Sequence, residues 1–495
     1  MKNIPCFIKR NWLGILLAGV TLVVLGYFFS YRILEIPLGL TSDEGAFGYN
    51  ATLLSRTLHD ESGKELPVFA LSISGKDWRQ PVPQYYITLF FKVFGANVFN
   101  LRFSSVVITL LSTILIYGLA FSMGGLIMAI AAAVVFVMTP LIMIQSHLGL
   151  DNITPVPFTI LWLIGMWSYR KTNGTKWIVL AGASLGVAFY SYKGMRALVP
   201  VWGVLTYMYI WWIGKWKVNK DALHSFLYLT LSLAPFVIMV PYLNKIYPGA
   251  LLGGTRPELK TWYDFFYPYL SSLDPSFLFI KGDELIYHST GRHGMLLFAT
   301  LPLFVIGAYK AFRKRDFESW VLLAFFSAPL LFGTVGSVHR ASRLMAIIPL
   351  YALISAIGAK WLYKQHKPLL FIVGLLMLLN YFDFVNYYWG DYPKFSQEYF
   401  GDLSIYKDYE IIALEAKKQG KDVFLPYDFV GREDQTHLFY SAAYLKDGYT
   451  VWKNEDELPL KGTLLVSTRE DIPGMKRLNI ELPNYILFER LDNGQ

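Results

Sequence analysis

The feature that most constrains this chain of 495 residues is a succession of apolar runs, each long enough to cross a bilayer. The first run, Trp12 to Tyr31, is nearly uncharged, and at about 1.5 Å per residue it covers a hydrocarbon core roughly 30 Å thick. Later runs lie at 98–121, 124–143, 153–169, 177–190, 197–214, 223–243, 294–310, 319–335, 344–362 and 368–387. The sequence therefore predicts a mostly α-helical, polytopic membrane protein with about eleven transmembrane helices.

Composition and cysteine content agree with a membrane protein. Only 16% of the residues are charged, whereas soluble domains carry about 25%. The first run is too long for a signal-peptide core and no small-residue cleavage site follows it, so we expect a retained anchor. The sole cysteine, Cys6, excludes an intramolecular disulfide and a cysteine metal cluster.

Basic residues indicate how the chain is oriented. The net charge of +9 is concentrated in short loops between apolar runs, which favours membrane orientation and not nucleic-acid binding. The basic loops alternate along the chain and lie near 2–10, 170–176, 215–220, 310–315 and 364–367. The positive-inside rule places these loops and the N-terminus in the cytoplasm, and the C-terminus on the outer face of the cell inner or plasma membrane.

Two outer loops are too long to be simple turns. The first, residues 35–97, is rich in glycine, proline and aromatic residues. Its segments 49–59 and 83–93 are predicted to be amphipathic helices that lie along the membrane interface. The second is the large outer loop 244–293. We expect residues 1–390 to form a transmembrane domain that holds both loops.

The composition changes near residue 390. Residues 410–419 read as a helix, and 422–426 and 463–467 read as strands. Because helices and strands alternate, residues 391–495 are predicted to form a small extracytoplasmic α/β domain.

Candidate catalytic acids lie just outside the predicted spans. Asp43 and Glu44 follow the first span, and Asp151 lies where the chain turns between two later spans. Carboxylates near the hydrocarbon boundary lose solvation, which raises their pKa and suits one of them to accept a proton. The alternatives are a solvated acidic pair at a helix end, and an Asp151 that only caps the helix beginning near Pro155.

Basic and aromatic residues gather on the same outer face. One group is the turn Tyr192, Lys193 and Arg196, and another holds Arg340 and Arg343. A carboxylate can remove a hydroxyl proton while Lys and Arg bind a phosphate leaving group. The alternative is that these cations contact lipid head groups or extend from helix ends to the interface.

Several of these segments, taken in order, resemble one family. The acidic opening motif from Asp43 to Ala51 is similar to that of the protein O-mannosyltransferase and aminoarabinose transferase superfamily, which comprises glycosyltransferases of the C fold. The likeness continues through residues 79–86, 93–95, 100–105, 180–196, 276–283 and 291–294. It covers roughly residues 10–390, whereas the last hundred residues resemble no family that we can place.

The resemblance implies an enzyme that moves a sugar from a polyprenyl-monophosphate carrier to a hydroxyl of a protein, lipid or glycan acceptor, usually with inversion. Asp43 would then act as general base, Glu44 would orient the acceptor or share the proton, and the basic residues would hold the carrier phosphate. A monophosphate leaving group needs less charge neutralisation than a diphosphate, so we expect no metal and no other cofactor.

Two departures from the family pattern affect the assignments. The second outer loop reads His147-Leu148-Gly149-Leu150-Asp151 where relatives carry an acid or arginine, so Asp151 is the candidate there. The first loop lacks a lysine-proline-proline motif, which leaves Lys76 and Arg79 as candidates for phosphate contact.

Other functions remain as alternatives. A lipid-linked saccharide flippase or other transporter would place ionisable residues deep within the spans, whereas here charge collects at one face. An O-antigen ligase or polymerase-like enzyme would use the late loop arginines without requiring acids directly after the first span.

Overall fold

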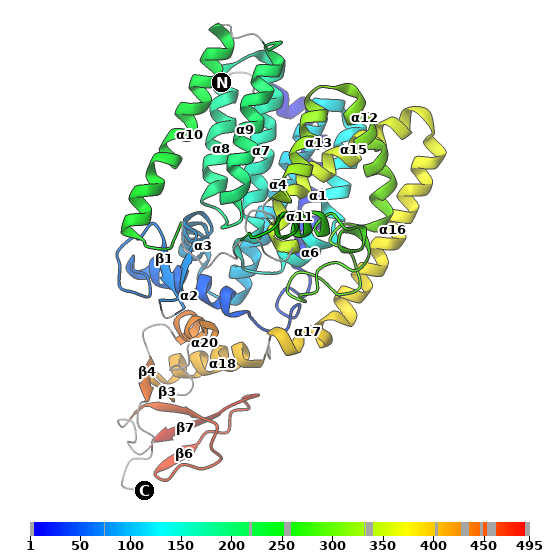
Figure 1. The fold of residues 1–495 in the computed structure, drawn as a ribbon. Helices are drawn as coiled ribbons and strands as arrows, with labels where there is room; N and C mark the ends of the chain where they lie inside the picture. The colour runs from blue at the N-terminus through cyan, green and yellow to red at the C-terminus, as the bar shows by residue number, and fades with distance from the viewer. Residues whose placement is uncertain are drawn as a thin grey trace.

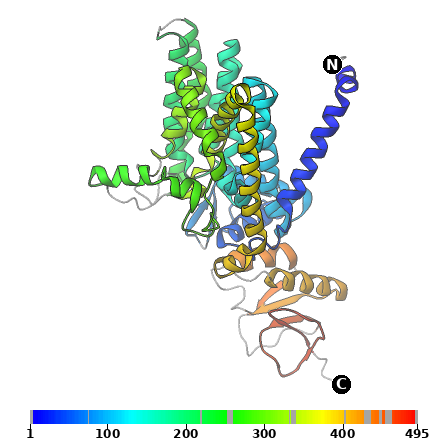
Figure 2. The same ribbon diagram turned by 90° about the vertical axis from the view of Figure 1, so that its right-hand side faces the viewer.

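The structure is a computed structural model of the chain. It describes residues 4–73, 75–216, 220–251, 259–330, 332, 340–400, 404–426, 435–445, 449–452 and 462–490. Long helices run side by side in one bundle, and a smaller domain with a β-sheet lies beyond one end of it (Figure 1). The turned view shows the same two parts, with the first helix inclined away from the others (Figure 2).

Each apolar run predicted from the sequence contains a helix of the bundle. These helices are α1 (Ile4–Ser30), α4 (Val98–Gly124), α5 (Leu126–Val137), α7 (Pro155–Thr172), α8 (Thr175–Phe189), α9 (Met195–Ile213), α10 (Lys220–Ile246), α12 (Leu301–Lys314), α13 (Phe317–Ser327), α15 (Ile348–Gln365) and α16 (Lys367–Gly390). Among the described residues, four helices are long and apolar enough to cross a membrane, or five if one bent pair counts as a span. The total of eleven spans stays a prediction.

The predicted run 124–143 is not one straight helix. Helix α5 ends at Val137, α6 (Pro140–Ser146) begins at Pro140, and the two are bent by 59°. Proline explains the break, because it has no N–H to continue the ladder and its ring clashes with the preceding turn. The chain after this bent pair leads into the loop that carries Asp151.

The first outer loop folds as the sequence predicts, with two helices. The segments 49–59 and 83–93 fall largely within α2 (Ser42–Thr57) and α3 (Pro81–Phe94). A short antiparallel hairpin, β1 (Ala70–Ser72) and β2 (Asp77–Arg79), joins them. Further short elements near this end are η1 (Asp151–Ile153), α11 (Trp262–Ser271), η2 (Ser276–Ile280), η3 (Phe298–Thr300) and η4 (Ala341–Ile347).

The C-terminal region contains helices and a mixed sheet. Its elements are α17 (Tyr392–Phe400), α18 (Ser404–Gln419), β3 (Val423–Pro426), α20 (Gln435–Tyr440), η5 (Ser441–Leu445), β4 (Tyr449–Trp452), β5 (Leu464–Ser467), β6 (Met475–Arg477) and β7 (Ile486–Arg490). The strand order is β4-β3-β5-β7-β6, with β3 parallel to both of its neighbours and β7 antiparallel to both of its own. The predicted helix lies within α18, and the two predicted strands contain β3 and β5, each beginning one residue earlier than the observed strand.

The C-terminal region packs directly on the first outer loop. Phe47 of α2 and Phe91 of α3 belong to one buried cluster with Phe439 of α20, and the rings of Phe91 and Phe439 stack with centroids 6.1 Å apart. Two glycines of α2 allow this approach. A Cβ atom on Gly45 would lie 2.6 Å from the backbone of Gln435, and one on Gly48 would lie 2.7 Å from the Phe439 ring.

We expect Gly48→Leu to displace the C-terminal region from α2, because the leucine side chain would occupy the space of the Phe439 ring. Limited proteolysis of the purified protein should then cleave the C-terminal region faster than in the wild type. Gly19→Leu, at an exposed position of α1 with open space around it, is the matched control and should leave the cleavage rate unchanged. Equal protection of Gly48→Leu and wild type would contradict the proposed packing role.

Candidate active site

The two acids of the opening motif lie in different environments. They are adjacent on α2, so their side chains point roughly 100° apart around the helix. The side chain of Asp43 is 60% exposed, whereas Glu44 is fully buried. Thr41 caps the helix, and a reciprocal hydrogen bond from its N–H to Glu44 completes a capping box. The start of α2 therefore directs Asp43 toward solvent and Glu44 toward the interior.

Glu44 forms a buried ion pair with Arg102 of α4. Arg102 Nε lies 3.0 Å from Glu44 Oε1, and neither side chain is exposed. The guanidinium also donates to the carbonyl oxygens of Ile33 and Pro37, at 2.9 and 3.0 Å, and to that of Gly39. One arginine thus binds the chain that leaves the first helix, the start of α2 and the start of α4.

The carboxylate of Glu44 is fully engaged. Oε1 also accepts from the backbone N–H of Gly149 at 2.9 Å, and Oε2 accepts from that of Thr41 at 3.1 Å. A buried carboxylate with this many donors has its oxygens already occupied and is closed to an acceptor molecule. This geometry favours a positioning role for Glu44 over the expected contact with the acceptor.

Removing one partner of this pair should destabilise the fold, because the other charge would stay buried alone. We expect Arg102→Met to lower the free energy of unfolding by about 3–5 kcal/mol, measured by thermal or chemical denaturation in detergent. Lys418→Met is the control, since Lys418 pairs with Glu415 on the surface and such pairs contribute about 0–1 kcal/mol. A similar small effect for both variants would contradict the role of Arg102.

Asp43 belongs to a chain of alternating charges. Arg79 Nη1 lies 2.8 Å from Asp43 Oδ1, and Arg79 Nη2 lies 3.4 Å from Asp77 Oδ2. Asp77 also pairs with Lys193. Arg79 and Asp77 alternate along β2, which places them on one face of the strand. The hairpin thereby joins the α2 acid to the turn between α8 and α9.

Arg196 extends this group of charges. Its guanidinium donates to the side chain of Gln80 and, at 3.1 Å, to the carbonyl of Leu251. The Nε atoms of Arg196 and Arg79 are buried and have no hydrogen-bond acceptor among the described residues. Buried donors are normally paired, so these two guanidinium groups point to an anionic or otherwise accepting ligand.

Asp151 lies close to the same charges. It is in η1, Thr154 and not Asp151 is the N-cap of α7, and no side chain caps that helix. Burial raises the pKa of Asp151 to about 7, and Arg79 and Lys193 act against this increase while Asp43 adds to it. The sequence predicts a raised pKa for the acids of the opening motif, Asp43 and Glu44, whereas the pKa that burial raises here is that of Asp151.

Tyr192 and Arg343 link the turn after α8 to η4. Burial raises the pKa of Tyr192, Asp151 raises it further, and hydrogen bonds with Ser342 and Arg343 act in the opposite direction. The second predicted arginine, Arg340, is bound elsewhere, with Nη1 3.2 Å from Asp283 Oδ1.

The backbone N–H of Ala341 donates to the other oxygen of Asp283 at 2.6 Å. Asp283 therefore holds the start of η4, the element that presents Arg343.

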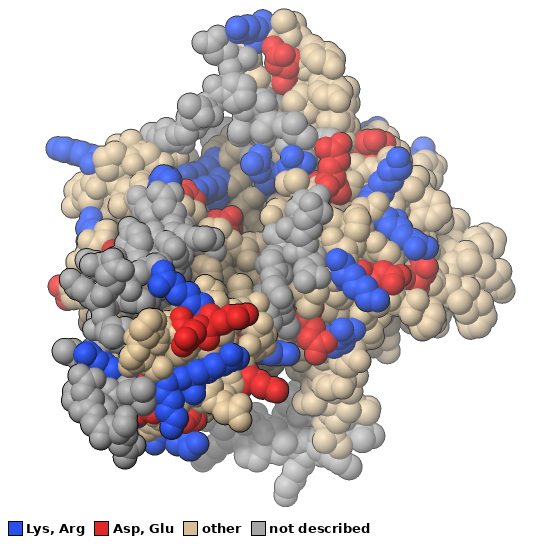
Figure 3. All heavy atoms as spheres, turned by 90° about the horizontal axis from the view of Figure 1, so that it is seen from below, with Lys and Arg blue, Asp and Glu red and all other residues tan. Residues whose placement is uncertain are grey.

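The structure brings most of the predicted site residues together. We call the following residues the charged cluster: Asp43, Asp77, Arg79, Asp151, Tyr192, Lys193, Arg196 and Arg343. Glu44 lies behind it, Arg340 lies beside it, and Lys76 is exposed in the turn between β1 and β2. Seen from the end at which the C-terminal region lies, the surface carries Lys and Arg side chains next to Asp and Glu side chains (Figure 3).

Sequence reasoning missed Asp77 and gave no role to Arg102. The spacing Asp77-x-Arg79 is the signal that could have placed Asp77, because alternate residues of a strand share a face. Among the described residues, no group of three or more His, Cys, Asp or Glu side chains could hold a metal ion. Metal dependence stays a prediction.

Asp151 should make stability depend on pH. Its pKa in the folded protein is raised from 3.8 to about 7, so between about pH 4 and about pH 7 the folded state binds more protons than the unfolded state and stability falls as pH rises. We expect Asp151→Asn to gain stability relative to the wild type across this range, measured as the difference in melting temperature. A difference that does not change with pH would contradict the raised pKa of Asp151.

Part of the chain matches a known family. Residues 79–243 match a family model described as dolichyl-phosphate-mannose-protein mannosyltransferase. No curated protein sequence matches the chain. The matched segment holds Arg79, Asp151, Tyr192, Lys193 and Arg196, and so includes more than half of the charged cluster.

Solved structures share the fold over nearly the whole chain. ArnT from Cupriavidus metallidurans in its apo state has a TM-score of 0.56 at 12% identity, with 97% of this chain and 98% of that chain covered. ArnT bound to undecaprenyl phosphate gives 0.54 at 12% identity, with coverages of 95% and 97%. The Archaeoglobus fulgidus oligosaccharyltransferase gives 0.50 at 13% identity, with 85% of this chain and 61% of that chain covered.

The chain has the fold of ArnT and of the archaeal oligosaccharyltransferase, which is the C fold predicted from the sequence. The predicted resemblance is confirmed by the family model and by the likeness to ArnT. The prediction of the C fold is thus confirmed for the fold as a whole.

Proposed function

We propose that this protein is a membrane glycosyltransferase that moves a sugar from a polyprenyl-monophosphate carrier to an acceptor hydroxyl on the outer face. The observation that carries the proposal is the charged cluster, in which an exposed carboxylate, Asp43, lies within 2.8 Å of a buried guanidinium, Arg79. The family match and the structure of ArnT with undecaprenyl phosphate support a donor of this class.

The cations of the cluster suit a phosphate. Arg79 and Arg196 each have a buried N–H without an acceptor among the described residues. Lys193 lies near Asp151. Arg343 lies near Tyr192, which is itself close to Asp151. Guanidinium groups bind phosphate oxygens in a planar, bidentate geometry. Their position beyond the ends of apolar helices fits a lipid whose chain stays in the bilayer and whose phosphate lies at the interface.

The reaction then follows from where the charges lie. The acceptor oxygen forms a bond to the anomeric carbon while the bond from that carbon to the phosphate oxygen breaks, and the electron pair leaves with the phosphate. Arg79, Lys193, Arg196 and Arg343 stabilise the charge that grows on the leaving phosphate, an effect that is strongest when donors are preorganised. The acceptor proton passes to Asp43.

Asp43 is the better base of the opening pair because it is accessible. Its carboxylate is exposed at the first turn of α2, where the ion pair with Arg79 holds it in place. Glu44 is closed off by its own hydrogen bonds and, through Arg102, fixes the start of α2. We therefore propose that Glu44 is a positioning residue and that Asp43 touches the acceptor.

The test is sugar transfer by the purified protein in lipid nanodiscs with a panel of polyprenyl-phosphate sugars and candidate acceptors. We expect Asp43→Asn to lower kcat by roughly 10²–10⁴-fold, the usual contribution of general-base catalysis, with little change in the KM for the donor. Asp391→Asn, at an exposed outer-face acid between α16 and α17, is the matched control and should keep wild-type activity.

The possible outcomes test the proposed reaction class and the role of Asp43 separately. If the wild type releases polyprenyl phosphate from none of the donors, the proposed reaction is wrong. If the wild type is active and Asp43→Asn is equally active, the class stands and Asp43 is not the base. A higher donor KM in Arg79→Gln with an unchanged fold would place the phosphate at the cluster.

A further inference from the structure

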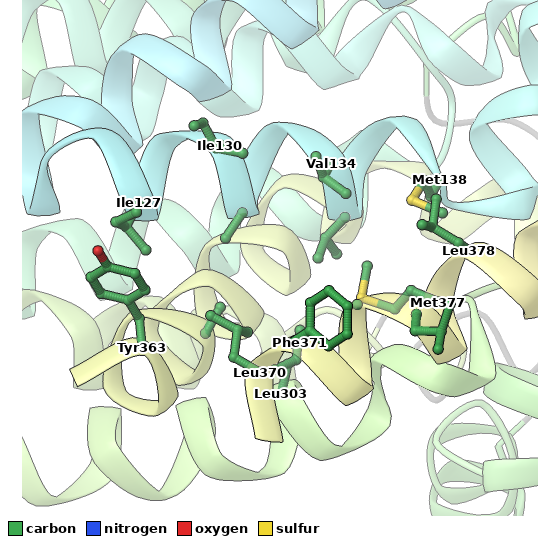
Figure 4. A pocket seen from close by; sticks show the side chains of 15 residues that line it. Ile127, Ile130, Val134, Met138, Leu303, Tyr363, Leu370, Phe371, Met377 and Leu378 are labelled. Carbon is green, nitrogen blue, oxygen red and sulfur yellow. The ribbon is translucent and has the colours of Figure 1, made fainter. Parts of the chain in front are cut away.

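Two adjoining hollows lie along α16, away from the charged cluster. The first has a volume of about 560 Å³ and is almost entirely apolar, with side chains from α5, α12, α15 and α16 around it (Figure 4). Its lining includes Ile130 of α5, Met138 directly after α5, and Phe371 and Met377 of α16.

The second hollow has a volume of about 270 Å³, and on two segments its lining residues follow those of the first within three positions. Pro140 follows Met138 on one side, and Asn380 follows Met377 one turn along α16 on the other.

The apolar hollow needs a hydrocarbon occupant. It lies between helices of the bundle, and only 22% of the apolar window of α16 is buried inside the protein. Water is a poor occupant of a space without polar partners, and an empty space forfeits dispersion contacts along its walls. An acyl chain fills such a groove and supplies the contacts that α16 lacks with α5.

The second hollow is polar and carries both signs of charge. Arg292 and Asp383 both line it. The Arg292 guanidinium lies over the Tyr387 ring, 5.2 Å from its centroid, and the Asp383 side chain is 58% exposed while one oxygen lies 3.1 Å from His293 Nε2. The backbone N–H of Ala299 donates a hydrogen bond to Asn380 Oδ1. The NH₂ group of Asn380 is therefore the part of this amide that can donate to a ligand.

We propose that this groove binds a phospholipid with a phosphate–ammonium head group, of which phosphatidylethanolamine is the type. The phosphate meets Arg292 and the amide of Asn380, the primary ammonium meets Asp383, and one acyl chain fills the apolar hollow. From Asp383 to Leu370 is thirteen residues of helix, about 20 Å at 1.5 Å per residue, which is the length of an extended acyl chain.

The charges decide between lipid classes. An anionic head group would place its negative charge beside Asp383 with only Arg292 to balance it, whereas a zwitterionic head group matches both residues. A primary ammonium also donates hydrogen bonds to a carboxylate, which a trimethylated ammonium cannot do. The site therefore prefers phosphatidylethanolamine to phosphatidylglycerol and to phosphatidylcholine.

This site is independent of the proposed glycosyl transfer. None of its lining residues belongs to the charged cluster, so loss of lipid binding and loss of sugar transfer can occur separately. Its role is to fix α16, which leads directly into α17 and the C-terminal region, against α5 and α12.

The test is lipid binding by the purified full chain, measured by native mass spectrometry and by the shift in melting temperature on adding each lipid. We expect phosphatidylethanolamine to bind roughly threefold to tenfold more tightly than the other two, a preference that corresponds to about one ion pair. Asp383→Asn should remove the preference while keeping binding, because the chain groove and Arg292 remain. Arg292→Gln should weaken phosphatidylethanolamine and phosphatidylglycerol alike.

Blocking the apolar hollow with a large side chain tests lipid binding in a second, independent way. Gly374 lines the apolar hollow with open space beside it, so Gly374→Trp should lower the binding of all three phospholipids. Gly118→Trp, at an exposed glycine of α4 that also has open space around it, is the matched control and should bind like the wild type.

Equal binding of the three lipids by the wild type, or an unchanged preference in Asp383→Asn, would overturn the head-group site. Equal binding by Gly374→Trp and Gly118→Trp would overturn the groove. Displacement of phosphatidylethanolamine by polyprenyl phosphate at equal concentration, lost in Gly374→Trp, would assign the groove to the carrier lipid and also overturn the proposal.

Discussion

The buried ion pair between Glu44 and Arg102 is the interaction on which the outer end of the bundle depends. Arg102 binds carbonyl groups of the chain that leaves the first helix, and Glu44 binds the loop after α6 through Gly149. Three segments that are far apart in the sequence, residues 33–44, the start of α4 and the loop after α6, thereby meet at one point. A pair buried this deeply adds little net stability compared with apolar residues, but it fixes geometry, which a reacting site requires within fractions of an ångström.

Hydropathy was sufficient to predict most of the helices, because an apolar run must form its backbone hydrogen bonds internally when it lies in a membrane. The break at Val137 was harder to place. Pro140 lies inside an apolar run, and proline within a membrane helix can be tolerated when neighbouring elements satisfy the freed backbone groups. The prediction of one continuous span therefore treated α5 and α6 as a single helix.

The site could be predicted in its residue types and its face, but not in its pairings. Asp43 and Glu44 are adjacent and chemically alike, and only the position of Arg102 shows which of the two is closed to solvent. The link from Asp43 through Arg79 and Asp77 to Lys193 spans 150 residues of sequence and depends on tertiary packing. Sequence spacing carries such information only within one strand or helix.

The glycines of α2 have a consequence for how this protein can be recombined with its relatives. One side of α2 presents Asp43 to solvent, while Gly45 and Gly48 receive α20 of the C-terminal region at distances that leave no room for a Cβ atom. A chimaera that exchanges only the residues after 390 would pack a foreign helix against Gly45 and Gly48 of α2. A successful exchange has to transfer α2 and α20 together. The acidic motif, which lies in α2, is then exchanged along with the C-terminal region.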